Sequence, residues 1–168
     1  VDIKGFFYNV NHGKLLKQIW TLGIRDKRLI CIISKMLKAE IDGEGVPEKG
    51  TPQGGLLSPL LSLIVLNELD WWVSSQWETF QPKNRSKNGW LQYAKKYTKL
   101  KSGFIVRYAD HFKIMCSTYG EAQRFYHSTV DFLNKRLKLE ISPEKSKVVN
   151  LKKNSSDFLG FKIKVIPK

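Results

Sequence analysis

Cysteine is scarce in this chain. Among 168 residues only Cys31 and Cys116 occur, far apart and outside any CxxC motif. We interpret both as buried, reduced thiols of an intracellular protein. Long apolar runs are missing as well, and without a run of about 18 apolar residues no transmembrane helix is predicted.

Acidic residues are few relative to basic ones. There are 15 Asp and Glu against 29 Lys and Arg, so the net charge is +14, with a pI near 9.8. This balance indicates a polyanionic partner, nucleic acid before an anionic membrane, although a merely soluble basic protein is the alternative. Hydrophobic residues make up 42% of the chain, enough at this length for one domain with a core.

Hydrophobic periodicity and turn residues predict an α/β (α+β) domain. Gly23 should end the first helix, Asp26 should cap the second, and Gly120 should open the last. Helices are expected over residues 11–22, 27–39, 56–77 and 120–137, and strands over 1–5, 104–108, 112–116, after a turn near 142–145, and over 157–166. Without the helix after Asp26 this is a split βαβ order, which gives an antiparallel, ferredoxin-like sheet with helices on one face.

The stretch "RYADHF" places Asp110 at the tip of the predicted hairpin. In the predicted sheet the end of the first strand lies beside this tip, so Asp2 should approach Asp110. Two carboxylates in a basic protein suggest divalent metal bound for phosphoryl transfer, because Mg²⁺ prefers oxygen ligands and paired ions can activate a hydroxyl. Taken singly, Asp110 is a common turn residue and Asp2 a strand-end acid, so this interpretation depends on the pair.

Several stretches resemble reverse transcriptases, most closely those encoded by group II introns, the maturases. They are "VDIKGFF", "GTPQGGLLSPLLSLIVLNELD", "RYADHF", "LKLEISPEKSKVV" and "FLGF", in the order of that family and across essentially the whole chain. The resemblance implies a reverse-transcriptase palm with helical elements of the fingers over residues 1–168. Because the chain starts abruptly within a predicted strand, we expect a fragment without the first fingers strands and the thumb, inactive or nearly so alone.

The resemblance also implies roles for a catalytic group of residues. Asp2 and Asp110 would bind Mg²⁺, with Mn²⁺ as a substitute, and the backbone carbonyl of Ile3 would be a further ligand. Lys145, in "SPEKS", would face the leaving pyrophosphate, where a positive donor stabilises developing charge. On its own, Lys145 would be interpreted as a surface lysine.

Nucleotide contacts are implied as well. Phe7 would lie below the incoming sugar and clash with a 2′-hydroxyl, selecting deoxynucleotides, although an ordinary core aromatic is equally compatible with this position. Gln53, Gly54 and Gly55 resemble the turn that contacts nucleotide and template, where paired glycines let backbone approach closely. A helix-entry loop is the alternative for that turn.

The polar insertion at residues 81–103 is rich in cations and aromatic rings. Basic groups neutralise phosphates and aromatic rings stack on unpaired bases, so RNA contact is predicted, with a solvated charged face as the alternative. The predicted RNA-binding residues are Lys83, Arg85, Lys87, Lys95, Lys96, Lys99 and Lys101.

Two positions depart from the family. Tyr8 stands where the family usually has Asp, a change we interpret as structural. His111 stands where the second acid of "YADD" is usual, and it touches the metal site. Neutral imidazole offers one softer nitrogen, a poor match to Mg²⁺ and a better one to Mn²⁺ or Zn²⁺, and protonated imidazole would repel metals. His111 is therefore a doubtful ligand, expected to weaken polymerase activity.

We predict an RNA-directed DNA polymerase of a group II intron maturase, which also binds intron RNA to assist splicing. The implied partners are group II intron RNA, an RNA template with a DNA primer, and a dNTP, and a homodimer is left open. The expected location is cytoplasmic in bacteria, or organellar. The first alternative is a catalytically degraded protein that acts as an RNA-binding splicing cofactor. An RNA-dependent RNA polymerase is the second, which Phe7 disfavours.

Overall fold

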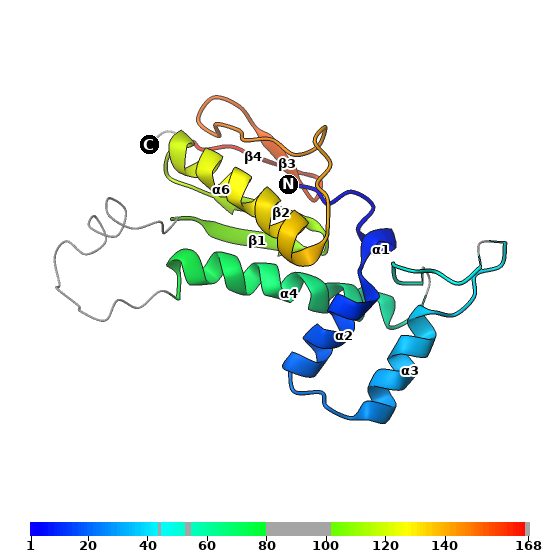
Figure 1. The fold of residues 1–168 in the computed structure, drawn as a ribbon. Helices are drawn as coiled ribbons and strands as arrows, with labels where there is room; N and C mark the ends of the chain where they lie inside the picture. Colours follow the sequence, from blue (N-terminus) through cyan, green and yellow to red (C-terminus); the bar gives the residue numbers. More distant parts are fainter. Residues whose placement is uncertain (44, 53–54, 80–101, 167–168) are drawn as a thin grey trace, which may run out of the picture.

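In this computed structural model the described residues are 1–43, 45–52, 55–79 and 102–166 (Figure 1). The first part contains helices α1 (Phe6–Asn9), α2 (His12–Thr21), α3 (Lys27–Leu37) and α4 (Ser58–Trp77). The second part contains β1 (Phe104–Tyr108), β2 (His111–Met115), α6 (Tyr119–Phe132), the π-helical segment η1 (Leu133–Leu137), β3 (Ser156–Phe158) and β4 (Phe161–Ile163). Helices and small antiparallel sheets are thus combined in one chain, and the predicted fold class is confirmed.

Side-chain caps set the beginnings of three helices. Asn11 caps α2, accepting a hydrogen bond from the Lys14 amide, and Asp26 caps α3 as predicted, accepting from the Arg28 and Leu29 amides. The last helix begins at Tyr119 and not at Gly120, because Thr118 and Glu121 form a reciprocal capping box there.

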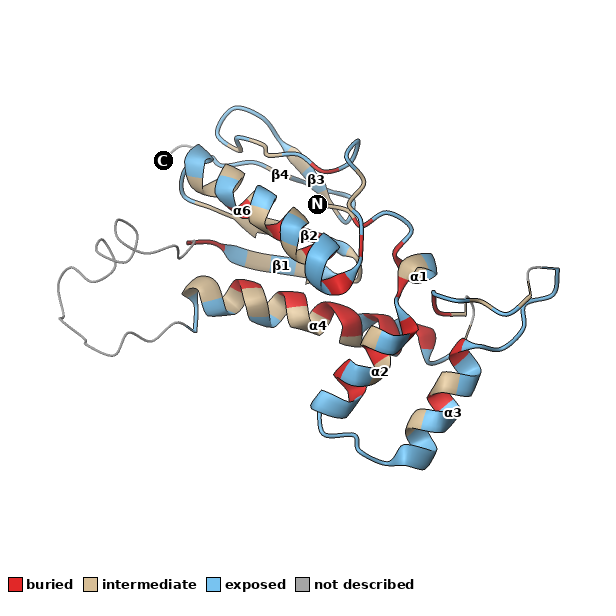
Figure 2. Cartoon of the chain, viewed as in Figure 1, coloured by how far each residue is buried: buried red, intermediate tan, exposed pale blue. Residues whose placement is uncertain are grey.

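Helix α4 is the central element of the core. It packs against α2 on one side and β1 on the other, and the red segments in Figure 2 follow its buried positions. A helix that is apolar on most of its circumference is stable only between other elements. Its fully buried side chains are Val65, Leu66, Leu69 and Val73, each contributing roughly 1.5–3 kcal/mol by leaving water.

The β1–β2 hairpin is antiparallel and closes with the pair Tyr108–His111. Ala109 and Asp110 form the two-residue turn between them, and Ala109 has a φ of 51°. A positive φ is what tight hairpin turns require, and here a residue other than glycine adopts it. The turn is therefore where the sequence predicted it, with β2 beginning one residue earlier.

The N-terminal residues lie between β2 and the segment that follows η1. Isolated bridges pair Asp2 with His111 and Ile3 with Ile141, both antiparallel. The chain start therefore reaches the tip of the hairpin, as the split βαβ order predicted. The sheet itself is less regular than expected, because β1–β2 and β3–β4 form separate two-stranded sheets and only isolated bridges extend the first.

Two predicted strands near the C-terminus differ in the structure. The strand expected directly after the turn near Lys145 does not form, because residues 146–150 have no regular secondary structure. The single strand expected over 157–166 is a hairpin instead, because Leu159 and Gly160 both have positive φ values and reverse the chain between β3 and β4. One continuous strand and a hairpin of two short strands have the same alternation of apolar residues, so the sequence analysis missed the turn.

The prediction for Cys31 was wrong. Helix α3 buries only Ile33 and Leu37, and Cys31 lies on its exposed side, whereas Cys116 is half-buried. Among the helices described here, none combines the length and hydropathy of a membrane span.

Candidate active site

The predicted carboxylates meet at the tip of the β1–β2 hairpin. The Val1 amine donates to the carbonyl of Phe112 over 2.8 Å, and the Phe112 amide donates back to Val1 over 3.2 Å. This register sets Asp2 opposite His111, next to the turn that contains Asp110. One ligand atom from each of Asp2, Asp110 and His111 lies within 4.8 Å of the others.

The side chain of Asp2 is the most enclosed member of this group, with 13% of its surface exposed. Its Oδ1 lies 2.6 Å from Nδ1 of His111, and its Oδ2 lies 3.8 Å from Nζ of Lys145. The short contact with His111 is not aligned as a hydrogen bond, and Oδ1 is buried without a hydrogen-bond partner among the described residues. A buried carboxylate oxygen in this state is suited to accept a cation.

Asp110 and His111 are more open to solvent than Asp2. Their side chains are 20% and 54% exposed, and the second ring nitrogen of His111, Nε2, lies 3.9 Å from Oδ1 of Asp110. The imidazole therefore has one nitrogen near each carboxylate. Lys145, predicted beside the leaving group, is 72% exposed and reaches the same cluster from the turn after Ser142.

Backbone hydrogen bonds fix the direction of the Asp2 strand. The Asp2 amide donates to Oγ of Ser146 over 3.1 Å, and the Ser142 amide donates to the Asp2 carbonyl over 2.9 Å. Because Asp2 faces this segment and Val1 faces β2, strand alternation turns the backbone of Ile3 toward the hairpin tip. Ser146 is buried and holds the Asp2 backbone, a role that sequence reasoning missed although its neighbour Lys145 was singled out.

A second missed feature holds the hairpin turn itself. Arg107 donates from Nε to Oδ1 of Asp70 over 2.8 Å and from Nη2 to Oδ2, and its Nη1 donates to the carbonyl of Ala109 over 2.9 Å. This bidentate ion pair joins α4 to the turn that carries Asp110. Alternation along β1 was the available signal, since it points Arg107 inward between the exposed Val106 and Tyr108.

Phe7 lies in α1 and contacts the loop that precedes Gln53. It is half-buried, and its ring packs beside that of Phe6 with centroids 5.4 Å apart, so it is a core aromatic. Its carbonyl accepts a hydrogen bond from the Thr51 amide over 2.7 Å, two residues before Gln53. The approach is tight at Gly50, whose φ is +97°, because an added Cβ would lie 3.1 Å from the carbonyl oxygens of Phe7 and Tyr8.

Part of the predicted nucleotide and RNA contacts lies outside the described residues. Gln53 and Gly54 lie outside the described residues. Gly55 is described at the entry to α4, where its carbonyl accepts a hydrogen bond from the Ser58 amide over 3.1 Å. The predicted RNA-binding residues are likewise outside the described part of the chain: Lys83, Arg85, Lys87, Lys95, Lys96, Lys99 and Lys101. Their roles stay predictions.

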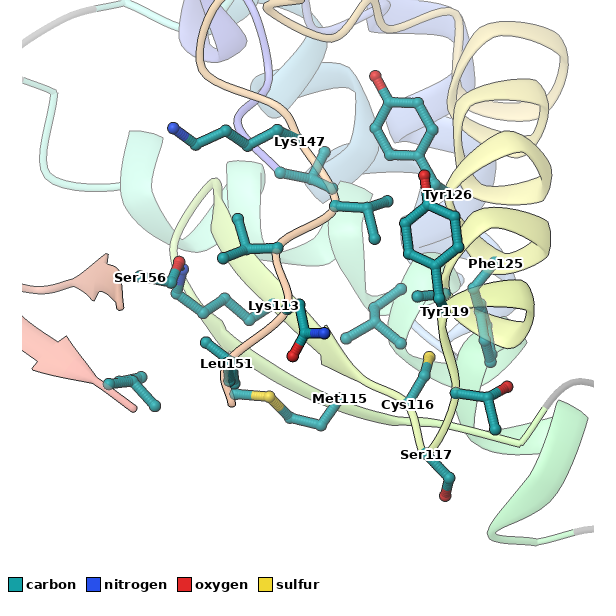
Figure 3. Close-up of a pocket in the computed structure, with 18 of the residues that line it drawn as sticks. Lys113, Met115, Cys116, Ser117, Tyr119, Phe125, Tyr126, Lys147, Leu151 and Ser156 are labelled. Carbon is teal, nitrogen blue, oxygen red and sulfur yellow. Dashed lines mark hydrogen bonds between the residues drawn. The ribbon is translucent and has the colours of Figure 1, made fainter. Parts of the chain in front are cut away.

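A pocket of about 370 Å³ opens beside the other end of β2 (Figure 3). It lies between β2, α6 and residues 147–152, and Cys116 and Tyr126 are among the side chains that line it. Burial raises the pKa of the Cys116 thiol to about 11. None of its lining residues is a predicted catalytic or binding residue, so this pocket and the carboxylate cluster are different places on the molecule.

Comparison with known proteins defines the class that this fold and site represent. The family model described as "Reverse transcriptase (RNA-dependent DNA polymerase)" matches residues 1–163. The chain therefore belongs to the reverse transcriptase family, as the resemblance of its motifs indicated.

Among curated relatives, the chain is similar to two intron-associated proteins and to one protein whose name mentions no intron. It is 31% identical to the group II intron-encoded protein LtrA of Lactococcus lactis subsp. cremoris, over 98% of this chain and 34% of that protein. It is 28% identical to the putative COX1/OXI3 intron 1 protein of Saccharomyces cerevisiae, over 99% and 24%. It is 26% identical to protein YkfC of Escherichia coli K12, over 96% and 45%. The chain thus spans from 24% to 45% of the length of these relatives.

Proposed function

We propose that this chain forms the palm, with part of the fingers, of a group II intron reverse transcriptase that makes DNA on an RNA template and also binds intron RNA to assist splicing. The observation that carries the proposal is the meeting of Asp2 and Asp110 from opposite parts of the chain in a basic member of this family. The intron-related names of two relatives support the choice of RNA.

The donor set supports a divalent cation at this cluster. Asp2 and Asp110 would hold it with the Ile3 carbonyl, and the buried, unpartnered Oδ1 of Asp2 fits that use. A bound divalent ion would supply stabilisation of the charge that develops on the transferred phosphate. In the proposed reaction the 3′-hydroxyl of the primer attacks the α-phosphate of a dNTP, the bond to the β-phosphate oxygen breaks, and pyrophosphate leaves.

The remaining predicted residues would bind and orient the substrates. Lys145 would place its ammonium beside the departing pyrophosphate, which its exposed position allows. Phe7 would exclude a 2′-hydroxyl, and Gln53, Gly54 and Gly55 would contact the nucleotide and template. The basic insertion would bind RNA phosphates. A homodimer and a cytoplasmic or organellar location stay predictions.

A second function is favoured by one specific observation, the imidazole of His111 in place of an acid. In this alternative the same fold binds structured intron RNA without polymerase activity. Because RNA binding does not require a metal in the palm, substitutions at Asp110 would then leave splicing assistance unchanged.

The test is primer extension on an RNA template with the full-length protein, in Mg²⁺ and then in Mn²⁺. We compare the natural chain with His111→Asp and Asp110→Ala, and we measure RNA affinity of each variant as a folding control. Extension by the natural chain that Asp110→Ala abolishes supports the polymerase. If only His111→Asp extends a primer, the RNA-binding function is the correct one.

A further inference from the structure

We propose that Asp2, Asp110 and His111 form a site for one divalent ion that accepts an imidazole nitrogen, of the Mn²⁺ type, and not for a pair of Mg²⁺ ions. The inference deepens the proposed function, because it concerns the same carboxylates. It does not depend on polymerase activity, since it is a statement about which ion these side chains bind.

The position of His111 against Asp2 is set by the backbone. These residues face each other as an antiparallel bridge, next to the hydrogen bonds between Val1 and Phe112. On its other edge the Asp2 backbone is held by the Ser142 segment. Residues opposite each other in such a pair have their side chains on the same face of the sheet, within contact distance. The register therefore keeps the Cβ atom of His111 beside the carboxylates, on the same face.

The ring lies between the two acids. Nδ1 is 2.6 Å from Asp2 Oδ1 and Nε2 is 3.9 Å from Asp110 Oδ1, with one ligand atom of each residue inside 4.8 Å. An ion about 2.2 Å from its ligands holds adjacent ligands about 3.1 Å apart and opposite ligands about 4.4 Å apart, and it binds one imidazole nitrogen. Closure of these three groups on a single ion therefore requires the ring and the Asp2 carboxylate to move apart by about 0.5 Å. The ring thereby occupies space between the carboxylates that a second ion would require.

The chemistry of the donors selects the ion. Mg²⁺ demands a near-octahedral shell of oxygens, and imidazole suits ions further along the transition series. Histidine at position 111 leaves Asp2 and Asp110 as the two carboxylates of this cluster, so fewer anionic oxygens are present to neutralise a second ion than an acid at position 111 would supply. In the described part of the chain, the metal-binding group consists of two acids and one histidine, which is enough for one ion when water completes the shell.

A competing arrangement uses the same contacts without any metal. In that case a protonated His111, together with Lys145 at 3.8 Å, would neutralise Asp2 and keep cations out. Lys145 is 72% exposed and free to move into solvent, whereas the histidine is held in register, so the outcome depends on His111. The two arrangements predict opposite results in a metal titration.

The test is a Mn²⁺ titration of the chain, followed by electron paramagnetic resonance, with no nucleic acid present. We expect one bound Mn²⁺, ¹⁴N modulation from a directly bound imidazole in the spin-echo spectrum, and little displacement by Mg²⁺ in about tenfold excess. His111→Asp should lose the ¹⁴N signal, and Mg²⁺ should displace its Mn²⁺ about tenfold more readily. Asp110→Ala should lose binding.

The matched control is His127→Asp, which makes the same change of side chain at an exposed position on α6. It should leave the number of bound Mn²⁺ ions, the ¹⁴N signal and the displacement by Mg²⁺ unchanged. Circular dichroism of each variant confirms folding. The proposal is overturned if the natural chain binds no Mn²⁺, if bound Mn²⁺ shows no ¹⁴N signal, or if Mg²⁺ displaces it at equal concentration. Metal binding of the predicted kind without primer extension would refute the polymerase and leave this inference intact.

Discussion

Removal of Asp70 should destabilise the domain by about 2 kcal/mol. Its partner Arg107 has a side chain that is only 13% exposed, and Asp70 itself is 32% exposed. Breaking a fully buried pair costs about 3–5 kcal/mol, because it leaves one charge unpaired out of water, and an exposed pair contributes at most about 1 kcal/mol. The Asp70–Arg107 pair lies between these limits, which gives the expected loss for Asp70→Ala.

The double variant Asp70→Leu with Arg107→Met separates charge burial from packing. It leaves no unpaired charge, so we expect it to be more stable than Asp70→Ala alone. The coupling energy between the substitutions Asp70→Leu and Arg107→Met should be about 1–2 kcal/mol. The Ala109 carbonyl loses its donor in this variant, so the hairpin turn should exchange its amide protons faster. Asp131→Ala is the control, since Asp131 makes an exposed pair with Lys135 and should cost less than about 0.5 kcal/mol.

Urea unfolding followed by circular dichroism measures these differences from the midpoints at constant slope. The reasoning fails if Asp70→Ala unfolds at the same urea concentration as the Asp131→Ala control. It also fails if the two substitutions in the pair are additive, because the guanidinium would then not depend on the carboxylate.

Two further predictions concern Gly50 and Cys116. Gly50→Ala should lower the free energy of unfolding by about 2 kcal/mol, and Gly23→Ala by about 1 kcal/mol. Both glycines have positive φ, but only Gly50 lies against backbone oxygens. Equal urea midpoints for the two variants would contradict this reasoning. In a Cys31→Ser background, alkylation of Cys116 should be half-maximal near pH 11. Since burial raises the folded pKa, the protonated thiol stabilises the fold fully below its unfolded pKa of about 8.5, and that contribution is lost as pH rises through about 11. Half-maximal alkylation near pH 8.5 would refute the burial argument.

Local patterns were sufficient to predict the longer helices and the β1–β2 hairpin in the described part of the chain. Apolar spacing predicted α2, α3 and α4, and the Asp26 cap was correct because a cap depends on amides two and three residues away. The β1–β2 hairpin was placed within one residue, since its turn lies between two short apolar runs. These features depend on near neighbours, and their information is contained in short windows of sequence.

The errors lie where a local pattern has two solutions. A run of alternating residues is compatible with one strand or with two strands and a turn, and positive φ at Leu159 and Gly160 selected the hairpin. The helix that carries Cys31 was predicted correctly, but which side faces the core depends on where α2 lies, and that side excludes Cys31. Backbone conformation decided the first outcome, and packing of α3 against α2 decided the second.

The proposed catalytic pair, Asp2 and Asp110, depends partly on the sequence and partly on the tertiary structure. The sequence alone identified Asp2, Asp110 and the unusual His111, because their motifs are local and specific. Only the tertiary structure brought Asp2 against the imidazole, anchored its backbone on Ser146, and joined the Asp110 turn to α4 through Arg107 and Asp70. These contacts join residues far apart along the chain, and their geometry follows from strand register and helix packing, which no short window of sequence contains.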